Sequence, residues 1–302
     1  MTVEGNIDLV CIDDIGYFYF QDDAAYGHLG GLPGRVIVDY EPRAFSHNLP
    51  DMQARFRRER HDGFFEKMIE IWGCEPDIYD VGTHVGRWSL PLALFAQQRD
   101  IDSCVFQFEP GRTASLLPYT LQINKLRNVQ LVEAVVSDFD GIASLRFDPT
   151  ILVSARAYKP AHAHITRLCR SISLDSFRAT HVRHRPALVK IDTEGHEVSV
   201  LRGAKNLLDS GQYIVTMEYR DWLMNSGRDV LDPLFESSYV FDVGQNMRIP
   251  YIVPVTELEG HFERVSSKRL KVEETDLLFI SKRISNLQQI LALVHAHPKF
   301  EH

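Results

Sequence analysis

Short apolar runs alternate with stretches of helical periodicity through the middle of the chain. The runs lack polar alternation, which is typical of parallel strands buried on both faces of a sheet. This order favours an α/β fold with a doubly wound, mostly parallel sheet. Predicted strands lie at 78–81, 103–108, 129–136, 142–147, 187–191 and 213–218, predicted helices at 62–72, 88–98, 113–124 and 198–209, and a short element at 173–177.

Both ends of the chain depart from this regular pattern. Apolar runs at 9–12 and 17–20 predict a small antiparallel lead-in, and 35–40 predicts a further strand in a region rich in Gly, Pro and Asp. Two late runs, 239–243 and 276–281, predict the last strands, with an antiparallel one in the edge region of the sheet. We divide the chain into an N-terminal lead-in (1–60), a main domain (61–285) and a C-terminal helical tail (286–302).

Composition narrows the class of protein. With 302 residues and 44% hydrophobic content, the chain can bury a large core as one domain or one domain with an added lobe. Its formal charge of −8 gives no electrostatic footprint for nucleic acid. Four widely spaced cysteines without a C-x-x-C pair argue against zinc or a disulfide framework. We find neither a signal-peptide pattern nor a run long enough to span a membrane, and we expect a cytoplasmic protein.

The stretch from Asp80 to Gly86 predicts a strand end, a tight turn and a helix start. Gly82 and Gly86 would let the backbone approach a ligand, and Asp80 at the strand tip could accept hydrogen bonds from it. A dinucleotide fingerprint needs glycines at positions one, three and six, but His84 and Arg87 occupy the last two, which disfavours NAD. An acidic strand end followed by G-x-x-x-G is typical of nucleoside-binding loops, although an ordinary strand-helix turn shows the same pattern.

Two further strand ends carry carboxylates. Glu109 follows the second strand of the series, where a carboxylate can hold both hydroxyls of a ribose, or can be a solvated turn acid. Ser137 and Asp138 follow the third strand. Asp138 can accept from an adenine amine, or can cap the turn before Gly141.

A second charged stretch follows the predicted strand at 187–191. Asp192, Glu194 and His196 crowd together at its end, which is costly unless the groups are paired or serve a site. Glu218 ends the next strand. Asp192, Glu218 and His196 could bind Mg²⁺, or could form a base with its orienting acid and need no metal.

The connection at 151–170 is long for a compact domain. Such length favours an active-site lid or a loop that recognises the acceptor. Its cationic side chains would suit an anionic acceptor group, and its H-x-H pair, His162 and His164, is more often a solvated loop than a metal site.

Five motifs in register give the chain a family resemblance. It resembles the FkbM family of S-adenosylmethionine (SAM) methyltransferases over about residues 60–220. The resemblance implies a Rossmann-like class I methyltransferase fold with seven strands, the last antiparallel, and O-methylation of sugars, glycans, polyketides or other secondary metabolites. The motifs are D-V-G-T-H-V-G (80–86), F-E-P (108–110), V-S-D-F-D-G (136–141), S-L-D-S-F (173–177) and K-I-D-T-E-G-H-E (190–197).

The resemblance also implies roles for individual residues. The family's usual Ala-Asn is Thr83-His84 here, so the contacts of that turn are not carried over directly. Asp192, Glu194 and His196 would lie beside the transferred methyl group. The predicted cofactor-binding residues are Asp80, Gly82, Thr83, His84 and Gly86 on the methionine and ribose side, Glu109 at the ribose, and Ser137 and Asp138 near the adenine.

An alcohol is a poor nucleophile while it is protonated, so a base with a pKa near neutrality would help the reaction. His196 is the natural candidate, with Asp192 orienting it or acting as the base itself. Glu194 would bind hydroxyls of the acceptor. Two other classes stay open: a SAM-binding module without turnover, and, less favoured, an NAD-dependent oxidoreductase.

Overall fold

A computed structural model describes most of the main domain and three strands near the N-terminus. β1 (Ile7–Ile12) pairs antiparallel with β2 (Gly16–Gln21), which confirms these two predicted strands, and β2 pairs parallel with β3 (Val36–Val38). Of the lid predicted at 151–170, residues 151–164, with His162 and His164, lie outside the described residues. Those are 7–12, 16–21, 36–38, 63–84, 86, 88–111, 114, 117–147, 165–180, 185–244, 251–266 and 274–301.

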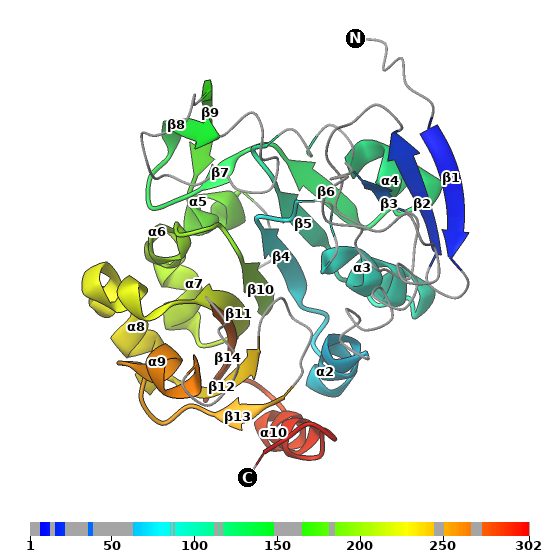
Figure 1. Cartoon of the computed structure of the whole chain (residues 1–302). Coiled ribbons are helices and arrows are strands. Elements are labelled where there is room, and N and C mark those ends of the chain that lie inside the picture. The colour runs from blue at the N-terminus through cyan, green and yellow to red at the C-terminus, as the bar shows by residue number, and fades with distance from the viewer. Residues whose placement is uncertain are drawn as a thin grey trace.

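A large, mostly parallel sheet forms the centre of the main domain (Figure 1). The order is β13-β12-β14-β11-β10-β4-β5-β6, and only β13 and β14 run against the others. The strands are β4 (Asp77–Val81), β5 (Val105–Phe108), β6 (Val129–Val132), β10 (Ala187–Ile191), β11 (Tyr213–Tyr219), β12 (Ser238–Gly244), β13 (Val253–Pro254) and β14 (Thr275–Ser281).

Two sequence expectations about this sheet need correction. Within the described residues it has eight strands rather than seven, because the two-residue β13 adds to β12. The antiparallel strand β14 lies between β11 and β12 instead of in the edge region. β14 pairs directly with β11, the strand that carries Glu218.

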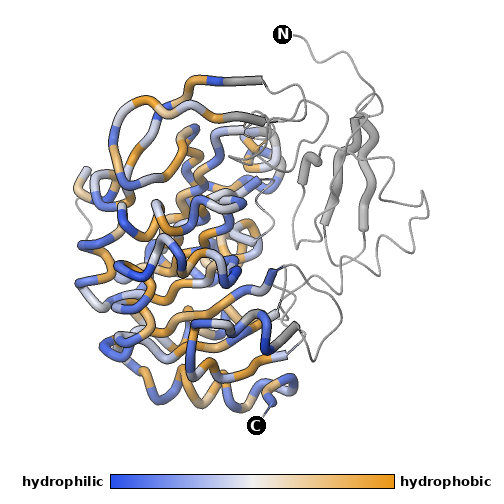
Figure 2. Tube along the Cα trace, turned by 60° about the vertical axis from the view of Figure 1, so that its left-hand side comes forward, coloured by the Kyte–Doolittle hydropathy of each residue, from blue (hydrophilic) through white to orange (hydrophobic). Residues whose placement is uncertain are grey.

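The helices cover both faces of the sheet. They are α2 (Phe64–Trp72), α3 (Ser89–Gln98), α4 (Leu117–Ile123), α5 (Leu174–Ala179), α6 (Glu197–Arg202), α7 (Lys205–Ser210), the short 3₁₀ helix η2 (Asp221–Leu223), α8 (Met224–Glu236), α9 (His261–Ser266) and α10 (Leu287–His295). Along them the tube in Figure 2 changes repeatedly between hydrophobic and hydrophilic, as expected for helices with one face against a sheet. None of the helices in the described ranges is long and apolar enough to cross a bilayer.

Neighbouring residues of each central strand belong to opposite layers. Ile78 and Leu188 pack with α2, α3 and α10 on one face, whereas Tyr79 and Val189 pack with α5, α6, α7 and α8 on the other. This follows from the two-residue period of a strand. Burial on both faces explains why the strands read as continuous apolar runs.

A second, three-stranded sheet stands beside the third strand of the series, in the order β7-β9-β8. The predicted strand at 129–136 is in fact two strands, because the chain turns at Ala134 and β7 (Val135–Val136) pairs with β9 (Ile165–Ile172). Residues 165–170 therefore belong to a strand, not to the predicted loop. β8 (Gly141–Phe147) confirms the strand predicted at 142–147.

The predicted helix at 198–209 is divided into α6 and α7. Gly203 explains the break, since a Cβ there would lie 1.9 Å from the carbonyl oxygen of Ser137. Such a close backbone contact tolerates only glycine. It brings the end of α6 against Ser137, which follows β7. His196, at the start of α6, contacts the same serine, so two of the predicted site segments lie together.

The strand order reverses at β4. The chain passes from β4 to β5 on one side and later returns to β10 on the other. In doubly wound sheets, ligands bind at the carboxyl ends of the strands where this reversal occurs. The segments that follow β4, β5 and β10 are therefore where a site is expected.

Candidate active site

Asp80 lies beneath the loop that follows β4. Its carboxylate has no exposed surface and accepts hydrogen bonds from Thr83 Oγ1 at 2.6 Å and Ser89 Oγ at 2.5 Å. The Lys190 ammonium lies 3.6 Å from its other oxygen. These contacts link the end of β4 to the loop and to the start of α3. The contacts seen for Asp80 are thus internal, and its predicted contact with a cofactor stays a prediction.

The backbone N–H groups of the loop donate hydrogen bonds to the end of β5 and to the residue that follows it. The N–H groups of Gly82 and Thr83 both donate to the carbonyl of Phe108, and the N–H of His84 donates to the Glu109 carboxylate. In the structure they hold the ends of β4 and β5 in one fixed arrangement.

Both loop glycines are explained by packing within the chain. Each has a positive φ, 78° at Gly82 and 79° at Gly86. A Cβ on Gly82 would lie 1.8 Å from the Asp192 carbonyl oxygen, and one on Gly86 would lie 2.8 Å from Gln107 Nε2. These glycines let the loop approach β10 and β5 closely, which accounts for them without a ligand.

Glu109 is the group here that best fits a ribose. Its two oxygens accept from His84 N at 2.8 Å and Gly111 N at 2.6 Å, so the carboxylate is fixed in place. Carboxylate oxygens each have a second acceptor position, which suits a pair of adjacent hydroxyls. Burial raises the pKa of Glu109, and the two N–H groups and the Lys190 charge oppose that rise.

His196 lies with the residues predicted for the adenine side. Its Nε2 is 3.0 Å from Ser137 Oγ, and that hydroxyl donates to Asp138 at 3.1 Å. With the hydroxyl proton engaged by Asp138, Nε2 is the donor to Ser137 and Nδ1 carries the lone pair. Burial lowers the pKa of His196, while Glu197 and Asp138 oppose this.

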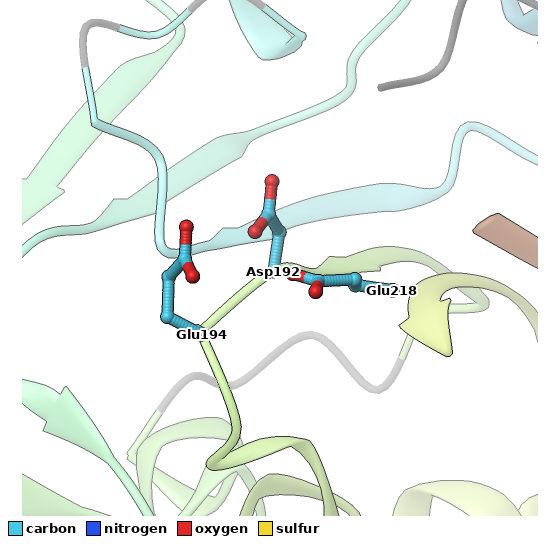
Figure 3. Close-up of side chains that lie close together, drawn as sticks. All are labelled: Asp192, Glu194 and Glu218. Atoms are coloured by element: carbon cyan, nitrogen blue, oxygen red, sulfur yellow. The ribbon is translucent and has the colours of Figure 1, made fainter. Parts of the chain in front are cut away.

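Three carboxylates gather at the ends of β10 and β11. Ligand atoms of Asp192, Glu194 and Glu218 all lie within 4.8 Å of one another. In Figure 3 the Glu218 side chain points toward Asp192. The sequence grouped Asp192 and Glu218 with His196 as metal ligands; the structure brings in Glu194 in its place, because the His196 ring is engaged at Ser137.

Neighbouring charges separate the pKa values of two of these acids. Burial disfavours the charged form of Asp192, but Lys190 Nζ at 3.1 Å outweighs it and lowers the pKa of Asp192. Burial and the negative Asp192 together raise the pKa of Glu218 to about 10. At neutral pH Asp192 is an anion and Glu218 keeps its proton, an arrangement suited to acid–base work.

The segment that carries the cluster is held by Glu197. One of its buried carboxylate oxygens accepts from Thr193 N, Thr193 Oγ1 and Gly195 N at 2.9–3.0 Å. As an acid in the first turn of α6, Glu197 complements the helix dipole. Its bonds also stabilise the turn in which Glu194 adopts a left-handed φ of 56°.

Two charged residues of the cluster were not singled out from sequence. Arg220 contacts Glu218 at 2.5 Å and also pairs with Glu274, and it lies 4.0 Å from Glu194. The run Glu218-Tyr-Arg-Asp-Trp offered a signal for Arg220. Glu274 carried none, since only the antiparallel pairing of β14 with β11 brings it here.

The strand order defines a doubly wound α/β protein, a class in which ligands bind at the switch point of the sheet. A sequence model of the methyltransferase FkbM domain matches residues 80–241, more than half of the chain. The chain belongs to the FkbM methyltransferase family. Membership implies a cofactor of the SAM type.

Two solved structures show remote similarity to the chain. The methyltransferase FkbM of Methylobacillus flagellatus KT has 14% identity and a TM-score of 0.40, over 68% of this chain and 43% of that one. An uncharacterised protein from Burkholderia thailandensis has 7% identity and a TM-score of 0.27, over 79% and 64%. The chain thus spans less than half of that FkbM structure. No curated protein matches it.

Proposed function

We propose that the chain transfers the methyl group of SAM to a hydroxyl of a small-molecule or glycan acceptor. The observation that carries this proposal is the position of two acidic groups on the two sides of the β4 loop. Glu109 follows β5 on one side, and Asp192 follows β10 on the other. One acid suits the cofactor and the other the acceptor.

The cofactor side combines the β4 loop with the ends of β5 and β7. Glu109 would hold the ribose hydroxyls, since its oxygens are fixed and have acceptor capacity left. Ser137 and Asp138 would lie near the adenine. The predicted contributions of Asp80, Gly82, Thr83, His84 and Gly86 become mainly the shaping of this loop.

The acceptor side is the cluster around Asp192. Bound SAM supplies an electrophilic methyl group, so the protein must align the acceptor oxygen and take up its proton. An oxygen of Asp192 would receive that proton, with Lys190 keeping the carboxylate ionised. Glu194 would accept from a further hydroxyl, and the neutral Glu218 would hold its own proton toward Asp192.

His196 has a different role in this proposal from the one the sequence favoured. Its Nε2 is engaged with Ser137, so it would join the Asp192–Glu197 segment to the cofactor side. A base at Nδ1 is the alternative role. The two assignments differ in pH dependence, because the pKa of Asp192 is lowered from an ordinary value of 3.8, whereas that of His196 is lowered from an ordinary value of 6.5.

Calorimetric titration with SAM and NAD⁺, followed by an acceptor screen with methyl-labelled SAM, tests the proposal. We expect SAM to bind, NAD⁺ not to bind, and S-adenosylhomocysteine to form with hydroxyl acceptors. Binding of NAD⁺ alone would contradict the proposal. Binding of SAM without turnover on any acceptor would instead indicate a regulatory SAM-binding module.

A further inference from the structure

Trp222 is a large aromatic side chain left half-exposed beside the carboxylate cluster. Its exposed fraction is 47%, whereas the other two tryptophans, Trp72 and Trp88, are 1% and 5% exposed. The mechanism above makes no use of it. Tryptophan combines a large apolar face with one polar N–H, so it is well suited to contact a ligand that is partly apolar.

The backbone that carries Trp222 is anchored on both sides. Leu223 and Met224, which follow it, are buried, and the preceding Asp221 accepts a hydrogen bond from the N–H of Glu263 in α9 at 3.0 Å. These anchors fix the backbone of η2. The exposed ring is therefore presented by a rigid element.

The indole of Trp222 packs closely against Gly195, in the segment that follows β10. A Cβ on Gly195 would lie 3.1 Å from Trp222 Cη2, so any larger residue would press on the ring. Gly195 directly follows Glu194, whose carboxylate belongs to the cluster. The apolar ring thus lies against the residue next to one of the three carboxylates.

Resting on the methyl transfer proposed above, we infer that Trp222 is a stacking platform for a sugar ring of the acceptor, whose hydroxyls bind the carboxylates of Glu194 and Asp192. One face of a pyranose presents C–H groups made slightly positive by neighbouring oxygens, and these pack on the electron-rich face of an indole. Its edge presents hydroxyl donors. Stacking and carboxylate contact together would set both the position and the tilt of the ring.

Other acceptor classes use only part of this surface. A flat aromatic acceptor would stack on Trp222 but offer few hydrogen-bond donors to the carboxylates, and an acyclic polyol would offer donors without a face that stacks. A cationic ligand would also suit an aromatic ring beside acids. Lys190 and Arg220 already pair with these acids, which favours a neutral polyhydroxyl ring.

Tryptophan fluorescence of the full-length protein tests this inference. The protein, saturated with S-adenosylhomocysteine, is titrated with methyl glycosides of glucose, galactose, mannose and rhamnose, and in parallel with sorbitol, phenol and tetramethylammonium. We expect a saturable change with at least one glycoside and none with the other three probes. The signal should disappear in Trp222→Phe, because the remaining tryptophans are buried.

A second measurement separates stacking from a general loss of structure. Calorimetry should give a glycoside Kd about tenfold higher in Trp222→Ala and a smaller change in Trp222→Phe, which keeps an aromatic face. Tyr239→Ala is the matched control: Tyr239 is 41% exposed and lies at the start of β12, far along the strand from the carboxyl ends. It should leave the Kd unchanged.

The outcomes distinguish this inference from the proposed function. Failure to bind S-adenosylhomocysteine would contradict the methyltransferase assignment itself. Cofactor binding with no response to any glycoside, an equal response to sorbitol, phenol or tetramethylammonium, or an unchanged Kd in Trp222→Ala would overturn the platform alone.

Discussion

A Cβ on Gly82 would lie 1.8 Å from the carbonyl oxygen of Asp192. The loop after β4, on the proposed cofactor side, and the segment after β10, with the proposed acceptor acids, therefore meet backbone to backbone at one glycine. The two halves of the site are positioned relative to each other by this contact.

Replacing Gly82 by Ala should destabilise the protein strongly. The new methyl group would collide with a backbone atom that cannot rotate away, and its φ of 78° is unfavourable for Ala. We expect a loss on the order of 3 kcal/mol in the free energy of unfolding, measured by urea denaturation.

Gly63→Ala is the control for that experiment. Gly63 has a similar φ of 71°, but a Cβ there meets nothing closer than 4.0 Å. It should cost only about 1 kcal/mol, the conformational part of the effect. Equal losses in the two variants would mean that the Gly82–Asp192 contact contributes nothing.

Glu109→Gln should weaken SAM binding. An amide would set its NH₂ group against the N–H of either His84 or Gly111, and it would lose the charge that strengthens the bonds to ribose hydroxyls. We expect the Kd for SAM to rise about tenfold to a hundredfold by calorimetry. Asp209→Asn, an exposed acid on α7, should leave the Kd unchanged. An unaltered Kd in Glu109→Gln would remove Glu109 from the cofactor site.

Glu218 should make the protein less stable as the pH rises. Its pKa in the folded state, about 10, is above its ordinary value of 4.5, so its contribution is complete below pH 4.5 and is lost progressively up to about pH 10. Glu218→Gln removes this titration. Between about pH 5 and 9 the variant should gain at least about 1 kcal/mol relative to the wild type in urea unfolding. A pH-independent difference would argue against the protonated acid.

A chelator should leave the activity unchanged. Although three carboxylates converge, Lys190 pairs with the ionised Asp192, Glu218 keeps its own proton, and Arg220 lies 4.0 Å from Glu194, so little negative charge is left unbalanced. We expect the same rate of S-adenosylhomocysteine release with and without EDTA. A loss of activity that Mg²⁺ restores would assign Asp192, Glu194 and Glu218 as a metal centre instead.

The sequence predicted those parts of the fold that have local signals. The strand, turn and helix around Asp80–Gly86 were readable because apolar runs, glycines and periodicity lie within a few residues. α8 was missed because Gly227 and Pro233 read as helix breakers. In the structure Gly227 lets α8 approach α6, since a Cβ there would lie 2.6 Å from Val198 Cγ2.

The site was predictable in its members but not in its grouping. Strand ends identified Asp192, Glu194 and Glu218, because parallel strands bring their carboxyl ends to one edge. The separation of His196 from this cluster depends on the turn at Ala134, which brings Ser137 to the imidazole. Glu274 arrives through antiparallel pairing across more than fifty residues, which no local pattern encodes.

The identity of the base is tested most directly by single-turnover methyl transfer at several pH values, in the wild type, Asp192→Asn and His196→Gln. If Asp192 is the base, Asp192→Asn should be slower by about a hundredfold or more while still binding SAM, and the wild-type rate should stay constant between about pH 7 and 5. Three results would contradict the account and assign the base to His196. The wild-type rate would fall as the pH is lowered over this range, His196→Gln would lose this pH dependence, and Asp192→Asn would react at the normal rate.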